Sequence, residues 1–198
     1  MIINEDLLLA HGATYEDYNP NDFIFAEGSS PKYFFQTISG TVELNSINME
    51  GKSFTFNIFS ERQSFGVSML FGDNNYPMNA VAISQCTVLR LPKSEFFTIL
   101  NDNPELMIGL IETLADDLYY SYLMLTNVSS TSPSLKIRML IEYLKNQHAD
   151  YKPFSYQVPL TRQQLANLTG MRVETIIRTV KKMEKERILK IENGKIFY

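Results

Sequence analysis

The apolar residues of this chain change their spacing near Pro92. From Asp22 to about Leu91 they occur in short runs separated by turn residues, and beyond Pro92 they recur at helical intervals. Short runs bounded by Gly, Pro, Asn and Ser are typical of strands joined by tight turns. An α+β chain is therefore predicted, with a compact antiparallel β-roll or barrel first and helices after it. The runs cover residues 23–25, 33–38, 41–44, 54–59, 80–83 and 88–91.

A long helix is predicted from Pro104 to about Val128. Its apolar residues follow one another in steps of four, three, four, seven and three, which is typical of a helix that pairs with a second helix. The alternative is that this face packs on the roll of its own chain, but a second apolar face, formed by Leu106, Leu110 and Tyr119, can make that contact. We therefore expect a homodimer interface through Met107, Ile111, Leu114, Leu118 and Leu125.

The last third of the chain has the pattern of a winged helix-turn-helix. Thr161 can cap a helix, and Gln164 stands three residues later as in a capping box. Gly170 ends that helix, and Asn193-Gly194 is a typical hairpin turn. The predicted elements are a helix at 135–144, a loop at 148–153, a strand at 154–158, helices at 162–168 and 173–187, and a hairpin at 188–198.

Charge is distributed unevenly along the chain. Residues 1–130 carry five basic and sixteen acidic side chains, a net charge of −11, whereas residues 131–198 carry thirteen and six, a net charge of +7. A basic tail region fits contact with a polyanion. A polar hinge at 127–133 lies between the two. We expect three domains, namely a sensor roll at 1–103, a dimerisation helix with its hinge at 104–130, and a DNA-binding domain at 131–198.

The second helix of the predicted DNA-binding domain has two faces. Ile176, Val180 and Met183 recur on the inner face, while Glu174 and Arg178 fall on the outer face. An arginine can donate two hydrogen bonds to guanine and a carboxylate can accept from cytosine, so the spacing predicts base contacts in the major groove. The alternative is a surface ion pair of little consequence. The candidate base-reading residues are Val173, Glu174, Ile177 and Arg178, and the candidate phosphate contacts are Thr161, Arg162, Gln163, Arg172, Thr175, Lys181 and Lys195.

Composition argues against metal, cofactor and membrane functions. The single cysteine, Cys86, permits neither an internal disulfide nor a multi-cysteine cluster, which suits a reducing compartment. Two isolated histidines, His11 and His148, leave few ways to build a metal centre or a catalytic triad. No apolar run approaches the ~18 residues of a membrane span. We expect a cytoplasmic protein that is not an enzyme and that uses no metal, cofactor or membrane.

Several segments of the sequence resemble the cyclic-AMP receptor protein and fumarate-nitrate reductase regulator (CRP/FNR) superfamily of bacterial transcription factors. Leu160–Ala166 and Val173–Arg178 are similar to its two DNA-binding helices, residues 33–42 to the strand and turn of its cyclic-nucleotide-binding roll, and Phe65-Gly66 to the start of its phosphate-binding cassette. The resemblance implies a double-stranded β-helix followed by a winged helix. It also implies a homodimer on near-palindromic double-stranded DNA, contact with RNA polymerase, and a signal in the roll that shifts the dimer helices.

The ligand residues of the cassette differ from those of family members that bind cyclic AMP. Those members have a glutamate directly after Phe-Gly and an arginine farther on, whereas this sequence has Val67 and Tyr76-Pro77-Met78 at these places. Burying a phosphate without a cation is costly, so we expect an effector other than cyclic AMP, or none. The remaining candidate pocket is small and largely apolar, and comprises Gly66, Val67, Ser68, Met69, Leu70, Tyr76, Pro77 and Met78.

Two other functions stay open at this point. One is a small-molecule sensor that uses the altered pocket of the roll. The other is an enzyme on a cupin-like barrel, against which the two isolated histidines argue. In the recognition helix, Val173 and Ile177 stand where branches of the family place an arginine and a serine. We therefore expect a half-site that differs from theirs, with Ile177 contacting a thymine methyl group or packing against the wing.

Overall fold

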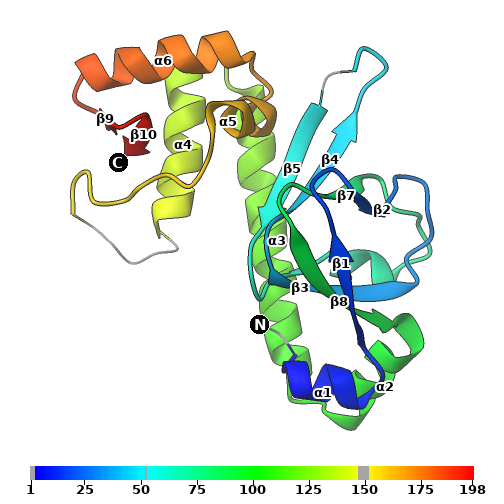
Figure 1. Cartoon of the computed structure of the whole chain (residues 1–198). Coiled ribbons are helices and arrows are strands. Elements are labelled where there is room, and N and C mark those ends of the chain that lie inside the picture. The colour runs from blue at the N-terminus through cyan, green and yellow to red at the C-terminus, as the bar shows by residue number, and fades with distance from the viewer. Residues whose placement is uncertain (1–2, 52, 147–151) are drawn as a thin grey trace. The chain divides into compact units, whose positions relative to one another are not determined.

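The structure is a computed structural model, and the residues it describes are 3–51, 53–146 and 152–198. The chain forms two compact units, Met1–Tyr119 and Tyr120–Tyr198. The boundary lies inside α3 (Leu106–Ser129), the long green helix of Figure 1. Within the described residues, no helix is long and apolar enough to cross a membrane.

Two four-stranded sheets form the body of the first unit (Figure 1). Their strand orders are β1-β8-β3-β6 and β2-β7-β4-β5, and the neighbouring strands pair antiparallel, as the sequence predicts. The prediction omitted β1 and β6, since β1 has the polar sequence TYEDY and β6 is only two residues long. The strands are β1 (Thr14–Tyr18), β2 (Phe23–Phe25), β3 (Tyr33–Ser39), β4 (Val42–Ile47), β5 (Ser53–Phe59), β6 (Ser64–Phe65), β7 (Asn79–Ala82) and β8 (Cys86–Pro92).

Alternation along β3 divides the apolar side chains of this unit between two cores. Phe35 joins Phe25, Phe65 and Tyr76 in the core of the roll. Phe34 joins the second core, where helical segments cover the other side of its sheet. These segments are α1 (Glu5–Ala10), the 3-10 helix η1 (Val67–Phe71), α2 (Lys93–Asp102) and the first part of α3. Of the strand aromatics expected to fill the core, Phe25 and Phe34 are buried, whereas Phe23 and Phe56 are exposed and Phe54 is half-buried, so for these three the expectation is wrong.

Helix α3 buries one face and exposes another. Leu110 is buried in the second core, and Leu106 and Leu114 pack partly against it. Leu114, expected in the dimer interface, thus contacts the core of its own unit. Tyr119 was expected to pack on the roll, and this is wrong, because the side chain is 62% exposed. The other four residues of the expected interface are exposed by 40% to 70%: Met107, Ile111, Leu118 and Leu125.

The second unit contains the end of α3, three further helices and a two-stranded hairpin. Its core combines residues from all three helices, including Ile137, Leu140, Leu165, Ile176, Val180 and Met183. The strand predicted at 154–158 is wrong, because only Gln157 forms an isolated bridge, to Phe197. Part of the predicted loop, residues 148–151, lies outside the described residues. The elements are α4 (Pro133–Asn146), α5 (Arg162–Thr169), α6 (Val173–Lys185), β9 (Lys190–Glu192) and β10 (Lys195–Phe197).

The junction between α3 and α4 is more ordered than the predicted polar hinge. Asn127 lies within α3, is fully buried, and its amide donates to the Lys136 carbonyl at 2.7 Å. The Lys136 side chain is only 9% exposed, and its ammonium donates to the Val128 carbonyl at 3.0 Å and to the Thr169 carbonyl at 3.2 Å. Val128 lies near the end of α3 and Thr169 at the end of α5, where carbonyls have no partner within their own helix. One lysine therefore joins the ends of two helices to the start of a third.

Candidate nucleic-acid interface

The helix-turn-helix begins with a fully formed capping box. The Thr161 hydroxyl accepts a hydrogen bond from the Gln164 backbone N–H at 3.1 Å, and the Gln164 side chain accepts one from the Thr161 N–H at 2.8 Å. These bonds satisfy two backbone donors that the first turn of α5 would otherwise leave unpaired. The cap therefore fixes where α5 starts, as the sequence predicts.

A left-handed glycine makes the turn between the two helices. Gly170 has a φ of 67°, and its N–H donates to the Ala166 carbonyl. Since residues with a Cβ adopt this backbone region at a cost, glycine is the residue best suited to this position. The chain leaves the turn through Arg172, which is the N-cap of α6.

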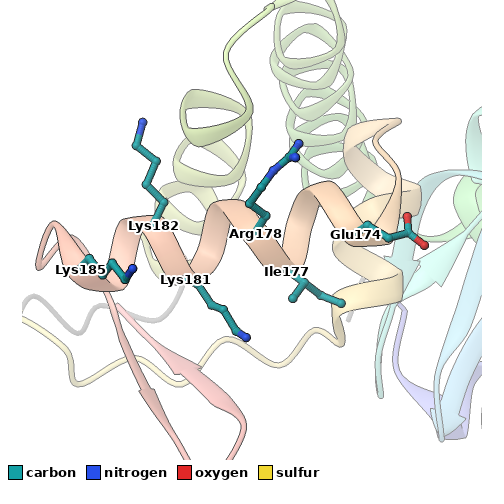
Figure 2. A pocket seen from close by; sticks show the side chains of 6 residues that line it. All are labelled: Glu174, Ile177, Arg178, Lys181, Lys182 and Lys185. Carbon is teal, nitrogen blue, oxygen red and sulfur yellow. The ribbon is translucent and has the colours of Figure 1, made fainter.

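Helix α6 presents one apolar and one polar face. Ile176, Val180 and Met183 are fully buried, which confirms the predicted inner face. Glu174 and Arg178 are exposed, Ile177 is 42% exposed, and Val173 is half-buried at the start of the helix. The side chains that line a shallow groove along the outer face are Glu174, Ile177, Arg178, Lys181, Lys182 and Lys185 (Figure 2).

Charge on this outer face is strongly positive, with four basic side chains against one carboxylate. Among the described residues, the ion pairs formed within 4.0 Å do not include one between Glu174 and Arg178, whose side chains point in different directions in Figure 2. Lys182 pairs with Glu186 at 3.7 Å. Arg178 and Glu174 are thus not held by one another, and both polar groups are available to a ligand.

The side chains of the outer face of α6 point to two different sides of the helix. Figure 2 shows Arg178 and Lys182 on one side of the outer face and Ile177 and Lys181 on the other. Lys182 and Lys185 are not among the candidate contacts predicted from the sequence, yet both line the groove. Their position at i+8 and i+11 from Glu174 is the signal that could have placed them on this face.

The hairpin β9–β10 forms the wing. Asn193 and Gly194 both have positive φ, 48° and 77°, which is the two-residue turn that the Asn-Gly pair predicts. Lys195 is exposed beside this turn. Arg162 donates to the Gly194 carbonyl at 3.4 Å, so it links the start of α5 to the wing, and burial lowers the pKa of this guanidinium from its usual value.

The candidate phosphate contacts lie around these elements. Thr161, Gln163 and Arg172 are exposed, and Arg162 and Thr175 are half-buried. A second groove runs between the start of α5 and the wing, and its lining includes Thr161, Arg162 and Lys195. Three of the seven candidates therefore share one groove, while Lys181 belongs to the groove along α6.

Two families of known proteins match this chain. Residues 15–103 match the cyclic nucleotide-binding domain, and residues 137–197 match the Crp-like helix-turn-helix domain. The chain belongs to the CRP/FNR superfamily. Proteins of this superfamily are transcription regulators and not enzymes, so the chain is a CRP/FNR-type regulator with a DNA-binding helix-turn-helix.

Similar CRP/FNR proteins span most of the chain. The cAMP-activated global transcriptional regulator CRP of Haemophilus influenzae is 23% identical over 93% of this chain and 83% of its own length. The HTH-type transcriptional regulator ArcR of Staphylococcus haemolyticus is 25% identical over 90% of this chain and 78% of its own length. The solved structure of the c-di-GMP responsive global regulator CLP of Xanthomonas campestris has a similar fold, with a TM-score of 0.76, 19% identity, and 97% and 96% of the two chains covered.

The cassette residues of this CRP/FNR roll do not face a single cavity. Val67 and Leu70 are buried in the second core, whereas Tyr76 is buried in the roll, with Met69 and Met78 packed partly against that core. Ser68 and Pro77 are exposed. The Tyr76 ring stacks on Phe25, with centroids 3.7 Å apart and planes 10° apart. A Cβ added at Gly66 would lie 3.3 Å from both rings, so the start of the cassette is closed by aromatic side chains.

Cys86 is the first residue of β8 and is buried. Its side chain is 1% exposed, and its thiol donates to the Thr41 carbonyl at 3.1 Å. Among the described residues, no group of three or more His, Cys, Asp or Glu side chains is placed to hold a metal ion.

Proposed function

We propose that this CRP/FNR regulator binds a near-palindromic DNA site as a homodimer, with one α6 helix in the major groove of each half-site. The observation that carries the proposal is the outer face of α6, where Arg178 and Glu174 are exposed, not paired with one another, and flanked by lysines. An α-helix of this kind fits the major groove, where an arginine can donate two hydrogen bonds to guanine.

Base reading by α6 depends on three kinds of contact. Arg178 supplies paired donors, Glu174 supplies an acceptor for cytosine, and Ile177 supplies an apolar contact for a thymine methyl group. Val173, half-buried at the first turn, contributes shape and no hydrogen bond. We expect the strongest sequence preference at the base pair that Arg178 contacts.

Phosphate contacts would supply affinity without sequence preference. The groove between α5 and the wing offers Thr161, Arg162 and Lys195, and the flanking side chains Gln163, Arg172, Thr175 and Lys181 surround the recognition face. Because these contacts release counterions, binding should weaken steeply as salt is added.

Dimerisation would use the exposed apolar residues of α3. Ile111 is 64% exposed, Leu118 52% and Leu125 70%, and they follow one another at heptad spacing. Exposed apolar residues spaced in this way along a helix are typical of an interaction surface. A second copy of the helix offers the same spacing, so the pairing is self-complementary. This proposal keeps the division of the chain into three domains, with boundaries after residues 103 and 130. It also keeps the contact with RNA polymerase that the family resemblance implies.

Cyclic AMP is not the effector in this proposal. The stacked Phe25 and Tyr76 rings fill the roll next to Gly66, and no arginine stands in the cassette to neutralise a phosphate. The relatives named above are described as responding to different nucleotides, cAMP for CRP and c-di-GMP for CLP. A different effector, or none, is therefore compatible with this fold.

In vitro selection of random duplexes by the purified, ligand-free full chain tests the proposal. We expect enrichment of a two-fold motif. Arg178→Ala should lose that preference and remain a dimer, whereas Arg138→Ala should keep it, because Arg138 is an exposed arginine of α4 that pairs with Glu142 outside both grooves. An unchanged motif with Arg178→Ala would remove this residue as a base reader. If neither the free protein nor the protein with cell extract enriches a motif, the proposed function is wrong.

A further inference from the structure

A cleft of about 310 Å³ lies in the first unit, apart from the cassette residues Gly66 to Leu70. It is bordered by β1, β2, β3 and β8, by the loop that follows β2, and by Tyr76 in the segment before β7, so all its walls belong to one compact unit. Its size is typical of sites for small molecules. The lining residues are Glu16, Tyr18, Ile24, Phe25, Ala26, Ser29, Ser30, Lys32, Tyr33, Phe35, Tyr76 and Arg90.

Aromatic rings supply much of this lining. Phe25 and Tyr76 form the stacked pair described above, and Phe35 lies beside Phe25 with centroids 5.8 Å apart. Tyr33 also lies near Phe35, with ring centroids 6.2 Å apart. A flat aromatic ligand can bury its faces against such side chains and gain stacking contacts as well as apolar burial.

Positive charge is concentrated at one part of the cleft. The Arg90 guanidinium lies 3.5 Å from the centre of the Tyr33 ring and forms an ion pair with Glu16 through one terminal nitrogen. Tyr18 donates to the other Glu16 oxygen at 2.5 Å, so the carboxylate is already held by two partners. A guanidinium has five N–H donors in a fixed plane, which leaves donors of Arg90 for a second anion.

Lys32 adds a second cation to the same lining. It is exposed, and within the described part of the chain its ammonium is in none of the ion pairs found within 4.0 Å. The cleft therefore carries two cations against one carboxylate. An anionic ligand group would restore the balance, whereas a cationic one would add a third positive charge.

The Tyr76 hydroxyl is buried and does not reach the surface of the cleft. Tyr76 is 3% exposed, and its hydroxyl has no hydrogen-bond partner among the described residues. Burial raises the pKa of this hydroxyl to about 12. Unpaired buried hydroxyls are uncommon in proteins because they lose their hydrogen bond to water without replacement.

From these observations we infer that the cleft binds a small aromatic carboxylate, with the ring against the aromatic wall and the carboxylate at Lys32 and Arg90. The aromatic wall shares Tyr76 with the altered cassette, whereas Lys32 and Arg90 lie outside the cassette. The inference does not rest on DNA binding, because every residue that carries it belongs to the first unit.

A two-dimensional 1H–15N NMR titration of the full chain with benzoate tests this inference. Binding of benzoate should be saturable, and the largest chemical-shift changes should be at the amides of residues 16–18, 29, 30, 32, 33 and 90. Cyclohexanecarboxylate, which has the charge without the aromatic ring, should bind at least threefold more weakly, and benzylamine, which has the ring with the opposite charge, should not shift these amides. Equal shifts from benzoate and benzylamine, or none from benzoate, would overturn the inference.

Variants separate the cleft from other basic surfaces. Lys32→Gln removes an exposed cation that forms no ion pair with any described residue, and should weaken benzoate binding by about three- to tenfold. Lys93→Gln is the matched control, because Lys93 also lies near an aromatic ring, 6.0 Å from the centre of Phe97, but outside the cleft. Tyr33→Leu should weaken binding while the fold, judged by the remaining amide positions, is kept. Unchanged affinity in both Lys32→Gln and Tyr33→Leu would also overturn the inference.

Discussion

Replacing Lys136 by methionine should destabilise the second unit much more than an ordinary surface substitution. The side chain is 9% exposed and donates to two helix-end carbonyls, on Val128 and Thr169. Methionine has nearly the same length and volume, so the substitution leaves little cavity and mainly removes the two hydrogen bonds.

The expected loss in the free energy of unfolding is the difference between opposing contributions. Each hydrogen bond from a charged donor contributes about 1.5–3 kcal/mol, and the ammonium also interacts favourably with the negative ends of the helices α3 and α5. Removal of the charge recovers part of its desolvation cost, which is several kcal/mol for a buried ion. Because the two carbonyls are left without a donor, we expect a net loss of about 2–4 kcal/mol in the free energy of unfolding of this unit.

Urea unfolding of the full chain with hydrogen-exchange readout measures this loss unit by unit, which avoids treating two compact units as a single two-state transition. Peptides from α4 and α5 should lose protection in Lys136→Met. Arg138→Met is the control on the same helix. Its ion pair with Glu142, at 2.7 Å, is exposed, so its loss should change the stability of this unit far less than the loss of Lys136. If Lys136→Met is as stable as the control, the ammonium does not join these helix ends.

Three further predictions concern the first unit and α3. Calorimetry with cyclic AMP should show no saturable heat, since the Phe25–Tyr76 stack occupies the roll, and saturable binding to the unaltered protein would contradict this. Leu118→Glu places a charge in the exposed stripe of α3 and should give monomers in sedimentation, whereas Phe23→Glu, at a similarly exposed apolar residue of β2, should not. Gly66→Ala should lower the free energy of unfolding more than Gly12→Ala does, by about 1 kcal/mol or more in urea unfolding. Both glycines have positive φ, but only a Cβ at Gly66 would meet side chains, at 3.3 Å. Equal losses in the two variants would refute the close contact.

Local signals explain which parts of the fold the sequence predicted well. The capping box at Thr161, the glycine turn at Gly170 and the Asn193-Gly194 hairpin are set by a few neighbouring residues, and all three are present in the structure. The inner face of α6 follows from helical period alone. These features are sufficient to position the outer face of the recognition helix.

Long-range packing explains what the sequence did not predict. The polar segment around Asn127 has the composition of a hinge, yet tertiary hydrogen bonds hold it inside α3. Leu114 fits a heptad seam, but the core of its own unit takes part of its surface. The cleft at Arg90 could not be predicted either, because its walls come from strands that are distant in sequence and meet only through sheet pairing.

The boundary between the two units affects how this regulator could be recombined with others. It falls between Tyr119 and Tyr120, in the middle of an unbroken helix, and the second unit buries Tyr120, Met124 and Asn127 from that helix. A chimera joined at the loop between α3 and α4 would give the winged helix a foreign helix end and lose the contact of Tyr120 with Tyr143, whose ring centroids are 5.0 Å apart. A functional exchange of DNA-binding halves should therefore be joined within α3, upstream of Tyr120 and in the same helical register.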